Sequence, residues 1–278
     1  MRPRAELVIS TYEKPRHLAV VLTALAGQRQ MPDSVCIADD GSEAATAAVI
    51  AGFAARYPQI ALRHIHHADQ GFRKNLILNR AIDSSTCDYL IFIDDDCVMA
   101  PGFVTRHLQL ARPGRFLSGS VIRLNADVTG QILAQGTAAW DSKGRLAGWT
   151  PQNLSERLKA QPLPLAAMAV LDRFSPVRCN WAGGNASAFR AALLAVNGFD
   201  ESMSYGGEDK ELGVRLRNSG LTARHLRYTA PLYHLDHGRG YVDPARKRQN
   251  RAMILSARKT GKVWTEDGLA KGPSATGD

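Results

Sequence analysis

Apolar and polar positions along the first 110 residues predict strands and helices in turn. Short apolar runs between turn residues are typical of buried strands, and apolar residues three or four apart indicate helices. The predicted strands are Glu6–Ser10, Ser34–Ala38, Ile60–His66 and Tyr89–Ile93. The predicted helices are Arg16–Gly27, Ala44–Tyr57, Lys74–Ile82 and Gly102–Leu110. This alternation favours an α/β fold with a mostly parallel central sheet flanked by helices.

The pattern is less regular beyond residue 112. Phe116–Leu124 predicts one strand, and Asp209–Ser219 predicts a helix that Gly220 ends. Gln131–Trp149 contains several glycines and has no clear period. For Gln152–Leu171, which contains prolines, we expect a helix followed by a flexible loop. Because the chain has no internal repeat and no low-complexity linker, we expect one continuous domain.

The composition is that of an ordinary soluble enzyme. Of 278 residues, 45% are hydrophobic and 22% are charged. No stretch approaches the roughly 18 apolar residues of a membrane span, and no apolar stretch of the secretory type follows the basic N-terminus. The four cysteines lie far apart without a C-x-x-C pair, which indicates free thiols in a reducing compartment. We therefore expect a cytoplasmic protein.

The net charge of +9 is concentrated near the C-terminus. We predict a basic helix over residues 241–262, and this region contains one acid, Asp243. Such a segment can bind phosphates or an anionic membrane surface, or it can be a solvated helix face. No nucleic-acid-binding motif accompanies it, so we expect no nucleic-acid partner. The eight basic residues from position 239 to position 262 are Arg239, Arg246, Lys247, Arg248, Arg251, Arg258, Lys259 and Lys262.

Three adjacent acids, Asp94, Asp95 and Asp96, follow the apolar run Tyr89–Ile93. The carboxyl end of a buried parallel strand borders the crevice where α/β sheets bind ligands. Adjacent carboxylates repel one another, and a divalent cation with oxygen ligands would relieve the repulsion. The alternative, a solvated acidic loop, is less consistent with the buried strand that precedes the acids.

A metal held by Asp94 and Asp96 could bridge the diphosphate of a ligand and neutralise a leaving nucleoside diphosphate. No P-loop and no G-x-G-x-x-G motif is present, so metal and basic side chains would have to hold such a diphosphate. A histidine could complete the metal shell, and the sequence leaves His234 and His237 open as candidates.

Two further motifs combine glycine with acids. Asp39 and Asp40 follow the second predicted strand. A carboxylate there can accept hydrogen bonds from a nucleobase imide and a ribose hydroxyl. A turn that caps the next helix is the simpler alternative. In Gly206–Asp209 the glycines allow a ligand to approach the backbone. An ionised acid there can act as a general base, and the alternative is an acidic helix start.

The order of these motifs resembles the GT-A glycosyltransferases of family 2, and the second half is similar to the galactosyltransferase-type C-terminal segment. The resemblance covers roughly residues 5 to 240. The matching motifs are Ile9-Ser-Thr-Tyr12, Asp39-Asp-Gly-Ser42, Gly71-Phe-Arg73 with Asn79, Asp94-Asp-Asp96, Trp181-x-Gly-Gly-Asn185 and Gly206-Gly-Glu-Asp209.

The resemblance implies a Rossmann-like GT-A domain that transfers one sugar with inversion. The donor would be a nucleotide sugar, most often a UDP-sugar, and the acceptor a glycan or lipid-linked hydroxyl. Mn²⁺ or Mg²⁺ would be the cofactor. Residues 1–112 would form the nucleotide-sugar-binding half and residues 113–240 the acceptor-binding and catalytic half. The basic helix, 241–262, could contact the inner membrane face, and we expect residues 263–278 to be a disordered tail.

The resemblance also implies residue roles. Asp209 would be the catalytic base and Glu208 an acceptor contact. The implied metal ligands are Asp94, Asp96 and His234 or His237. The implied donor contacts are Thr11, Asp39, Asp40, Arg73, Asn79, Asp94 and Asp95. The implied acceptor side is formed by Trp181, Gly183, Gly184, Asn185 and Gly207.

The sequence departs from the family pattern at two positions. Leu78 stands where an arginine usually precedes Asn79, and Asp95 replaces a small residue between the metal acids. Two other classes of function compete with a transferase. A sugar nucleotidyltransferase would need a Gly-rich loop after the first strand, where Ser10–Lys14 has no glycine. A non-catalytic nucleotide- or sugar-binding protein would not need the intact Gly-Gly-Glu-Asp motif.

Overall fold

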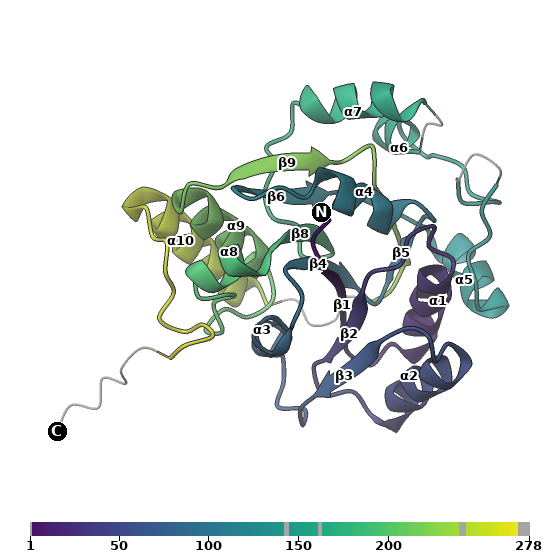
Figure 1. Cartoon of the computed structure of the whole chain (residues 1–278), viewed down its shortest axis with the longest axis horizontal. Coiled ribbons are helices and arrows are strands. Elements are labelled where there is room, and N and C mark those ends of the chain that lie inside the picture. Colours follow the sequence, from purple (N-terminus) through teal and green to yellow (C-terminus); the bar gives the residue numbers. More distant parts are fainter. Residues whose placement is uncertain (1, 142–144, 161–162, 239–242, 272–278) are drawn as a thin grey trace.

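The computed structural model describes residues 2–141, 145–160, 163–238 and 243–271. Within these ranges, seven strands form a central sheet in the order β3-β2-β1-β4-β8-β6-β9 (Figure 1). Pairs among β3, β2, β1 and β4 are parallel, as is β6 with β9, whereas β8 is antiparallel to both neighbours. The strands are β1 (Ala5–Thr11), β2 (Ser34–Asp39), β3 (Leu62–His66), β4 (Tyr89–Asp94), β6 (Arg115–Gly119), β8 (Asn185–Phe189) and β9 (Thr222–Leu226).

Helices cover both faces of this sheet. The apolar side chains of α1, α2 and α4 pack on one face, and those of α3, α8 and α9 pack on the other. The mostly parallel α/β sheet with flanking helices is therefore confirmed, and the predicted elements of the first 110 residues are all present. The helices are α1 (Pro15–Ala26), α2 (Ala44–Arg56), α3 (Lys74–Ser84), α4 (Phe103–Leu110), α8 (Arg190–Ala195) and α9 (Glu208–Asn218).

A second, three-stranded sheet closes one end of the central sheet. It consists of β5 (Cys97–Met99), β10 (Leu232–His234) and β7 (Val121–Arg123). Since β5 follows the three acids directly, this small sheet brings residues from the C-terminal half to the end of β4. The functional consequence is that His234, which ends β10, is placed next to the acids.

The middle of the chain differs from the prediction. Phe116–Leu124 forms two strands, β6 and β7, because Asn185 donates a hydrogen bond to the carbonyl oxygen of Ser120 where the chain passes from one sheet to the other. An unpredicted helix, α5 (Ala126–Gln135), is capped by Asn125. The segment predicted as a helix and a loop contains two helices, α6 (Leu154–Lys159) and α7 (Leu165–Arg173).

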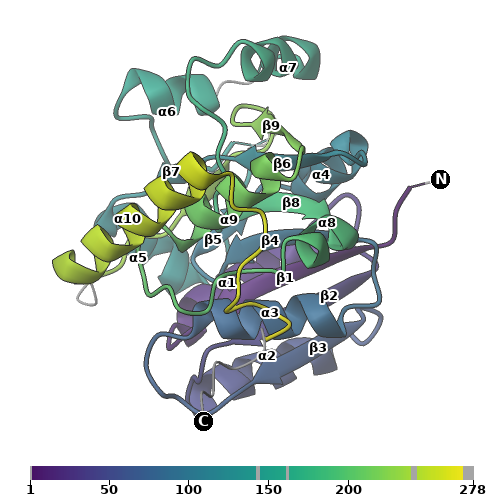
Figure 2. The same ribbon diagram turned by 90° about the vertical axis from the view of Figure 1, so that its left-hand side faces the viewer.

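The C-terminal region contains the predicted basic helix as α10 (Pro244–Thr260), which Asp243 caps. This helix packs alongside α9 (Figure 2). The predicted disordered tail is wrong for residues 263–271, because Asn197 hydrogen-bonds to the backbone of Thr265 and Ala270. Residues 241–242 and 272–278 lie outside the described residues. Among the described helices, none combines the length and the apolar character that crossing a membrane requires.

A buried ion pair fixes α9 in place. Arg215 is fully buried, and its guanidinium contacts Glu211 at 2.8 Å on the same helix. It also donates hydrogen bonds to the carbonyl oxygens of Val196 and Gly198. Since these two residues follow α8, the arginine ties the two helices together. This matters for function because the N-terminus of α9 carries Glu208 and Asp209.

We expect Arg215→Ala to lower the free energy of unfolding by about 3–5 kcal/mol, because it leaves the buried Glu211 charge unpaired. Lys210→Ala, on the exposed side of the same helix, is the control and should change it by no more than about 0.5 kcal/mol. Urea denaturation followed by circular dichroism measures both. Equal effects of the two substitutions would show that the ion pair does not fix α9.

Candidate active site

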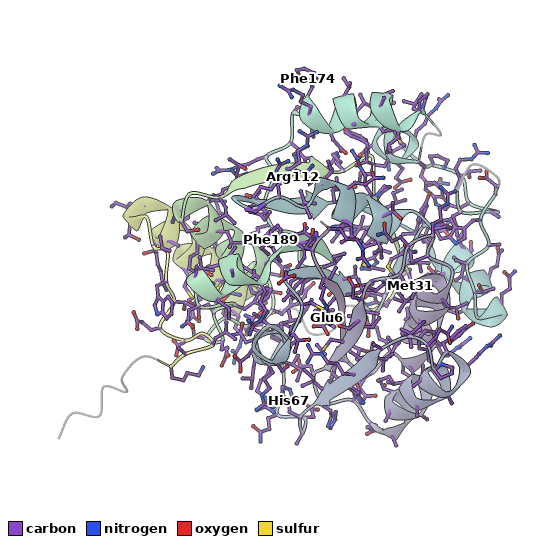
Figure 3. All side chains as sticks on the ribbon, viewed as in Figure 1. Glu6, Met31, His67, Arg112, Phe174 and Phe189 are labelled. Carbon is purple, nitrogen blue, oxygen red and sulfur yellow. The ribbon has the colours of Figure 1, made fainter. Side chains whose placement is uncertain are left out.

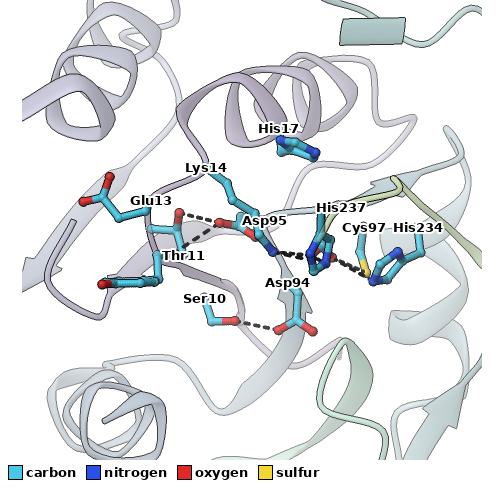
Figure 4. A network of polar contacts seen from close by, with 12 residues as sticks. Ser10, Thr11, Glu13, Lys14, His17, Asp94, Asp95, Cys97, His234 and His237 are labelled. Atoms are coloured by element: carbon cyan, nitrogen blue, oxygen red, sulfur yellow. Dashed lines mark hydrogen bonds and ion pairs between the residues drawn. The ribbon is translucent and has the colours of Figure 1, made fainter. Parts of the chain in front are cut away.

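The three acids at the end of β4 contact different partners, and Figure 4 shows this for Asp94 and Asp95. Asp94 accepts hydrogen bonds from Ser10 Oγ and from Lys74 Nζ, both at 2.6 Å. Asp95 accepts a hydrogen bond of 2.7 Å from Thr11 Oγ1. Because β1 and β4 are parallel neighbours, the residues that end both strands meet at the same edge of the sheet.

The third acid, Asp96, faces the C-terminal half of the chain. Its carboxylate lies 3.0 Å from His237 Nε2 and 3.6 Å from His234 Nε2. The two imidazole rings stack with their centroids 5.3 Å apart. Lys14 Nζ lies 2.7 Å from the same carboxylate and 3.3 Å from His237 Nε2. Both candidate histidines follow Asp96 by 138 or more residues in the sequence, and the tertiary structure brings them to this one acid.

The geometry of this cluster fits a divalent metal. One ligand atom each from Asp96, His234 and His237 lie within 4.8 Å of one another. Imidazole and carboxylate together suit ions such as Mn²⁺. A second group of Asp94, Asp96 and Cys97 meets the same distance criterion. Burial raises the pKa of the Cys97 thiol well above its usual value, which makes this thiol a poor ligand.

The charges around the acids shift their pKa values in opposite directions. Burial alone would raise the pKa of Asp96, but the hydrogen bond from His237 and the charge of Lys14 outweigh it and hold that pKa well below the ordinary range. Burial and the neighbouring charge of Asp96 raise the pKa of Asp95. Asp96 is therefore the acid that stays ionised and attracts a cation most strongly.

On the other side of the acids, Asp39 and Asp40 end β2 and are almost fully buried. Asp39 lies 2.9 Å from His64 Nε2 and accepts a hydrogen bond from the backbone N–H of Ser42. Asp40 lies 2.8 Å from His67 Nε2 and accepts a hydrogen bond from the backbone N–H of Arg73. An ionised carboxylate can accept about four hydrogen bonds, so each acid keeps capacity for a ligand.

Asp209 lies in the first turn of α9, after Gly207, whose φ of +113° favours glycine. Its Oδ1 atom is buried and accepts no side-chain hydrogen bond among the described residues, although the backbone N–H of Gly183 faces the carboxylate. A Cβ on Gly183 would lie 2.2 Å from that atom, and a Cβ on Gly184 would lie 2.8 Å from Asp94 Oδ2. The two glycines therefore let the backbone pass directly against both carboxylates.

Lys74, at the start of α3, connects these acids electrostatically. Burial alone would lower its pKa, but the charges of Asp94, Asp209 and Glu208 raise it well above the usual value. Conversely, burial and the charge of Glu208 raise the pKa of Asp209 to about 7, although the charge of Lys74 opposes that shift. Asp209 is thus an acid that changes protonation state near neutral pH, the property of an effective general base.

Several predicted site residues have structural contacts. Asn79 donates hydrogen bonds to Phe199 and Glu201 and accepts one from the backbone N–H of Phe199. Trp181 is 1% exposed and packs its ring against other aromatic rings of the core. Asn185 donates hydrogen bonds to the carbonyl oxygens of Ser120 and Ala230. Donor or acceptor contacts of these three residues stay predictions, and the observed contacts give each a role in holding the fold.

Two other predicted residues are directed by local hydrogen bonds. The Arg73 guanidinium donates to the carbonyl oxygen of Ala68, so its backbone N–H is what contacts Asp40. Glu208 accepts a hydrogen bond of 2.7 Å from the backbone N–H of Gly206. Glu208 is therefore fixed next to Asp209 at the start of α9, and its acceptor contact stays a prediction.

Sequence analysis missed four residues that contact the acids. They are Lys14 and Lys74, which contact the acids after β4, and His64 and His67, which contact those after β2. The available signal was position, since Lys74 begins the helix after Gly71-Phe-Arg73 and the histidines occupy the end of the third strand. Which acid each would contact could not be read from spacing along the chain.

Two protein-family models match the chain. A model described as glycosyl transferase family 2 matches residues 6–175, and one described as the N-terminal domain of galactosyltransferase matches residues 174–238. The two matched regions adjoin and contain all the acids and histidines described above. The predicted resemblance is thus confirmed over both halves of the chain.

The chain is similar in sequence to two named synthases. The chain is 24% identical to the chondroitin synthase of Escherichia coli over 231 residues, which are 79% of this chain and 33% of the relative. It is 24% identical to the hyaluronan synthase of Pasteurella multocida over 233 residues, 77% of this chain and 23% of the relative. The chain thus spans a third or less of the length of these two relatives.

Solved glycosyltransferase structures share the fold. The mannosyltransferase PcManGT from Pyrobaculum calidifontis, in complex with GDP-Man and Mn²⁺, has a TM-score of 0.62 and 17% identity, covering 94% of this chain and 65% of that one. GalNAc-T7 with UDP, GalNAc and Mn²⁺ has a TM-score of 0.62 and 13% identity, covering 92% of this chain and 49% of that one. These similarities establish the GT-A fold.

We expect His234→Ala and His237→Ala each to weaken Mn²⁺ binding by roughly 10-fold or more, because each removes one nitrogen from the cluster around Asp96. His17→Ala is the matched control, since its ring lies 6.4 Å from that of His237 and outside the cluster. Calorimetric titration of the purified proteins with MnCl₂ gives the affinities. Unchanged affinity in both cluster variants, or an equal loss in the control, would exclude this site.

Proposed function

The chain belongs to glycosyl transferase family 2, and on that basis we propose that it is an inverting, metal-dependent transferase of one sugar from a nucleotide sugar. The single observation that carries the proposal is the buried carboxylate of Asp209, whose Oδ1 atom accepts no side-chain hydrogen bond among the described residues and faces the backbone of Gly183. A carboxylate can accept about four hydrogen bonds, so this group keeps capacity for a ligand. The hydroxyl of a sugar acceptor is such a ligand.

The donor is proposed to lie along the carboxyl ends of β1, β2 and β4, with UDP as its nucleotide. Thr11, Asp39 and Asp40 would contact the base and ribose, which present N–H and O–H donors to these acceptors. Lys74 and Lys14 are proposed to face the diphosphate, because they are the cations in contact with the acids after β4. They compensate for Leu78, which stands where an arginine is usual in the family.

The residues that fit a metal are Asp96, His234 and His237, and the carboxylate of Asp94, which lies within ligand distance of Asp96, could add a second oxygen. A bound Mn²⁺ or Mg²⁺ would stabilise the negative charge that develops on the leaving nucleoside diphosphate. Lys14, in contact with Asp96, would assist by adding positive charge at the same place. The presence of Mn²⁺ in PcManGT and GalNAc-T7 supports a divalent ion here.

Asp209 is proposed to take the proton of the acceptor hydroxyl as its oxygen attacks the anomeric carbon. The attack comes from the face opposite the leaving diphosphate, so one displacement inverts the configuration. Glu208 and the Gly183–Gly184 backbone would orient the acceptor, since they border the base. The acceptor is proposed to be a glycan or lipid-linked hydroxyl, and α10 supplies a basic surface for peripheral contact with an anionic membrane.

Calorimetric titration with UDP, GDP and CMP, in Mn²⁺ and in EDTA, tests the donor assignment. We expect UDP to bind in Mn²⁺ and to lose most of its affinity in EDTA. Asp96→Asn should bind UDP equally weakly under both conditions, because the metal cluster lacks its ionised acid. Failure of every nucleotide to bind would refute the transferase proposal, and tight binding in EDTA would refute metal dependence.

Asp209→Asn should lower kcat about 10²–10⁴-fold and leave UDP affinity within about twofold, because it removes proton transfer without removing a donor contact. Asp83→Asn, the same chemical change at an exposed position of α3, is the control and should keep full turnover. Radiolabelled sugar transfer measures kcat. Normal turnover in Asp209→Asn would refute the assignment of the base.

The pH dependence follows from the pKa of Asp209, which is raised to about 7. Because the base acts in its ionised form, kcat should rise as pH increases through about 7 and level off above it. Lys74→Met removes a charge that lowers this pKa, so the rise should move to higher pH. Lys74→Arg should keep the original profile. A profile that does not move in Lys74→Met would contradict the electrostatic link.

A further inference from the structure

Exposed apolar side chains are concentrated on one small part of the surface. Six of the ten large apolar side chains that are exposed in the described residues lie between residues 154 and 177. Single exposed apolar side chains are normal, whereas a concentration of them marks an interaction site. The six are Leu154, Leu163, Leu165, Val170, Phe174 and Val177.

This segment forms α6 and α7, which lie together at the outer edge of the molecule beyond β9 (Figures 1 and 2). Helix α7 is anchored on its inner side by the buried Asp172. The Asp172 carboxylate accepts hydrogen bonds from the backbone N–H of Tyr228 at 2.8 Å and from Thr229 Oγ1. The fold therefore holds the inner side of α7 in place, while Leu165, Ala166, Val170 and Arg173 of the helix remain exposed.

The opposite side of α7 is apolar and exposed. Helical spacing places Ala166, Val170 and Arg173 on one face, away from Asp172. Phe174 ends the helix with 74% of its surface exposed, and Val170 is 53% exposed. Figure 3 shows Phe174 at the outer margin of the molecule, pointing away from the body. We call this surface, formed by Ala166, Val170, Arg173 and Phe174, the outer face of α7.

The charges around the outer face are of one sign. Arg157, Arg173 and Arg178 are exposed. The acids of the segment are engaged elsewhere, since Glu156 accepts hydrogen bonds at the start of α6 from the backbone N–H of Gln152 and from Asn153, and Asp172 is buried. The surface thus offers apolar side chains flanked by arginines, the pattern of helices that lie in the interface of an anionic bilayer.

We propose that the outer face of α7 docks the protein on an anionic lipid bilayer. Val170 and Phe174 enter the boundary between headgroups and acyl chains, and the arginines contact lipid phosphates. A second copy of this chain is a less suitable occupant, because a symmetric contact would bring the same arginines face to face. The proposal extends the proposed membrane contact and rests on the proposed function only for the lipid-linked acceptor. Lipid binding itself requires no sugar transfer.

Vesicle sedimentation tests the proposal with the full chain. We expect binding to vesicles of equal parts phosphatidylcholine and phosphatidylglycerol, and little binding to phosphatidylcholine alone. The double variant Val170→Asp/Phe174→Asp should lower the partition coefficient roughly 10-fold or more, because it removes the apolar contact and adds repulsion. Arg173→Gln/Arg178→Gln, which keeps the apolar side chains and the basic helix α10, should weaken the preference for anionic vesicles.

Trp264→Asp is the matched control, because Trp264 is 43% exposed and belongs to neither α7 nor the basic helix α10. It should sediment like the unchanged protein. Metal-dependent UDP binding by every variant would show that the site and the fold are intact. If the unchanged protein itself does not bind UDP, the proposed function fails, whereas the docking proposal is still tested by vesicle binding. Equal vesicle binding by the double variant, or an equal loss in Trp264→Asp, would overturn the proposal. A dimer that only the Val170→Asp/Phe174→Asp variant dissociates would assign the outer face to self-association instead.

Discussion

Mutual repulsion among carboxylates is the constraint on which this site depends. Three acids end β4, and Asp209 lies beside them at the start of α9, separated only by a backbone of two glycines. So many negative charges in a partly buried place are stable only with cations near them. Lys74 and Lys14 supply two of these cations, and the imidazoles around Asp96 supply a place for a third.

The balance of charge also separates the acids by protonation state. Asp96, beside Lys14 and His237, remains ionised and is suited to holding a metal. Asp209, farther from these groups and beside Glu208, has its pKa raised to about 7 and is suited to exchanging a proton. Two carboxylates in one site thus acquire different protonation states from their surroundings.

The remainder of the fold serves mainly to bring distant segments to this edge. The small sheet carries His234 to the acids, and the buried Arg215 fixes the helix that begins with Glu208. Trp181 and Asn185 fill the core behind the two glycines, so they position the site from within. By contrast, α6 and α7 contribute little to the core and present exposed apolar side chains and arginines outward.

Much of the fold and the position of the acid motifs could be predicted, because both follow from local sequence patterns. The apolar period fixed the strands up to β4, and the acids that follow a buried strand had to lie at the edge of the sheet. The pattern was less informative after residue 112, where Phe116–Leu124 divides between two sheets. Apolar residues of similar type occur in both strands, so the local pattern does not mark where the first strand ends. At that point Asn185, which is distant in sequence, donates a hydrogen bond to the carbonyl oxygen of Ser120.

The sequence by itself determined the α/β architecture, the acid motifs and the glycines that must stand close to them. Only the tertiary structure decided which cation meets which acid, because partners such as Lys14 and Asp96 are far apart along the chain and meet through packing alone. It also decided that both histidines reach Asp96 and that Asn79 and Trp181 support the fold. Residue type states what a side chain can do, whereas its neighbours in space set its charge, its pKa and its partner.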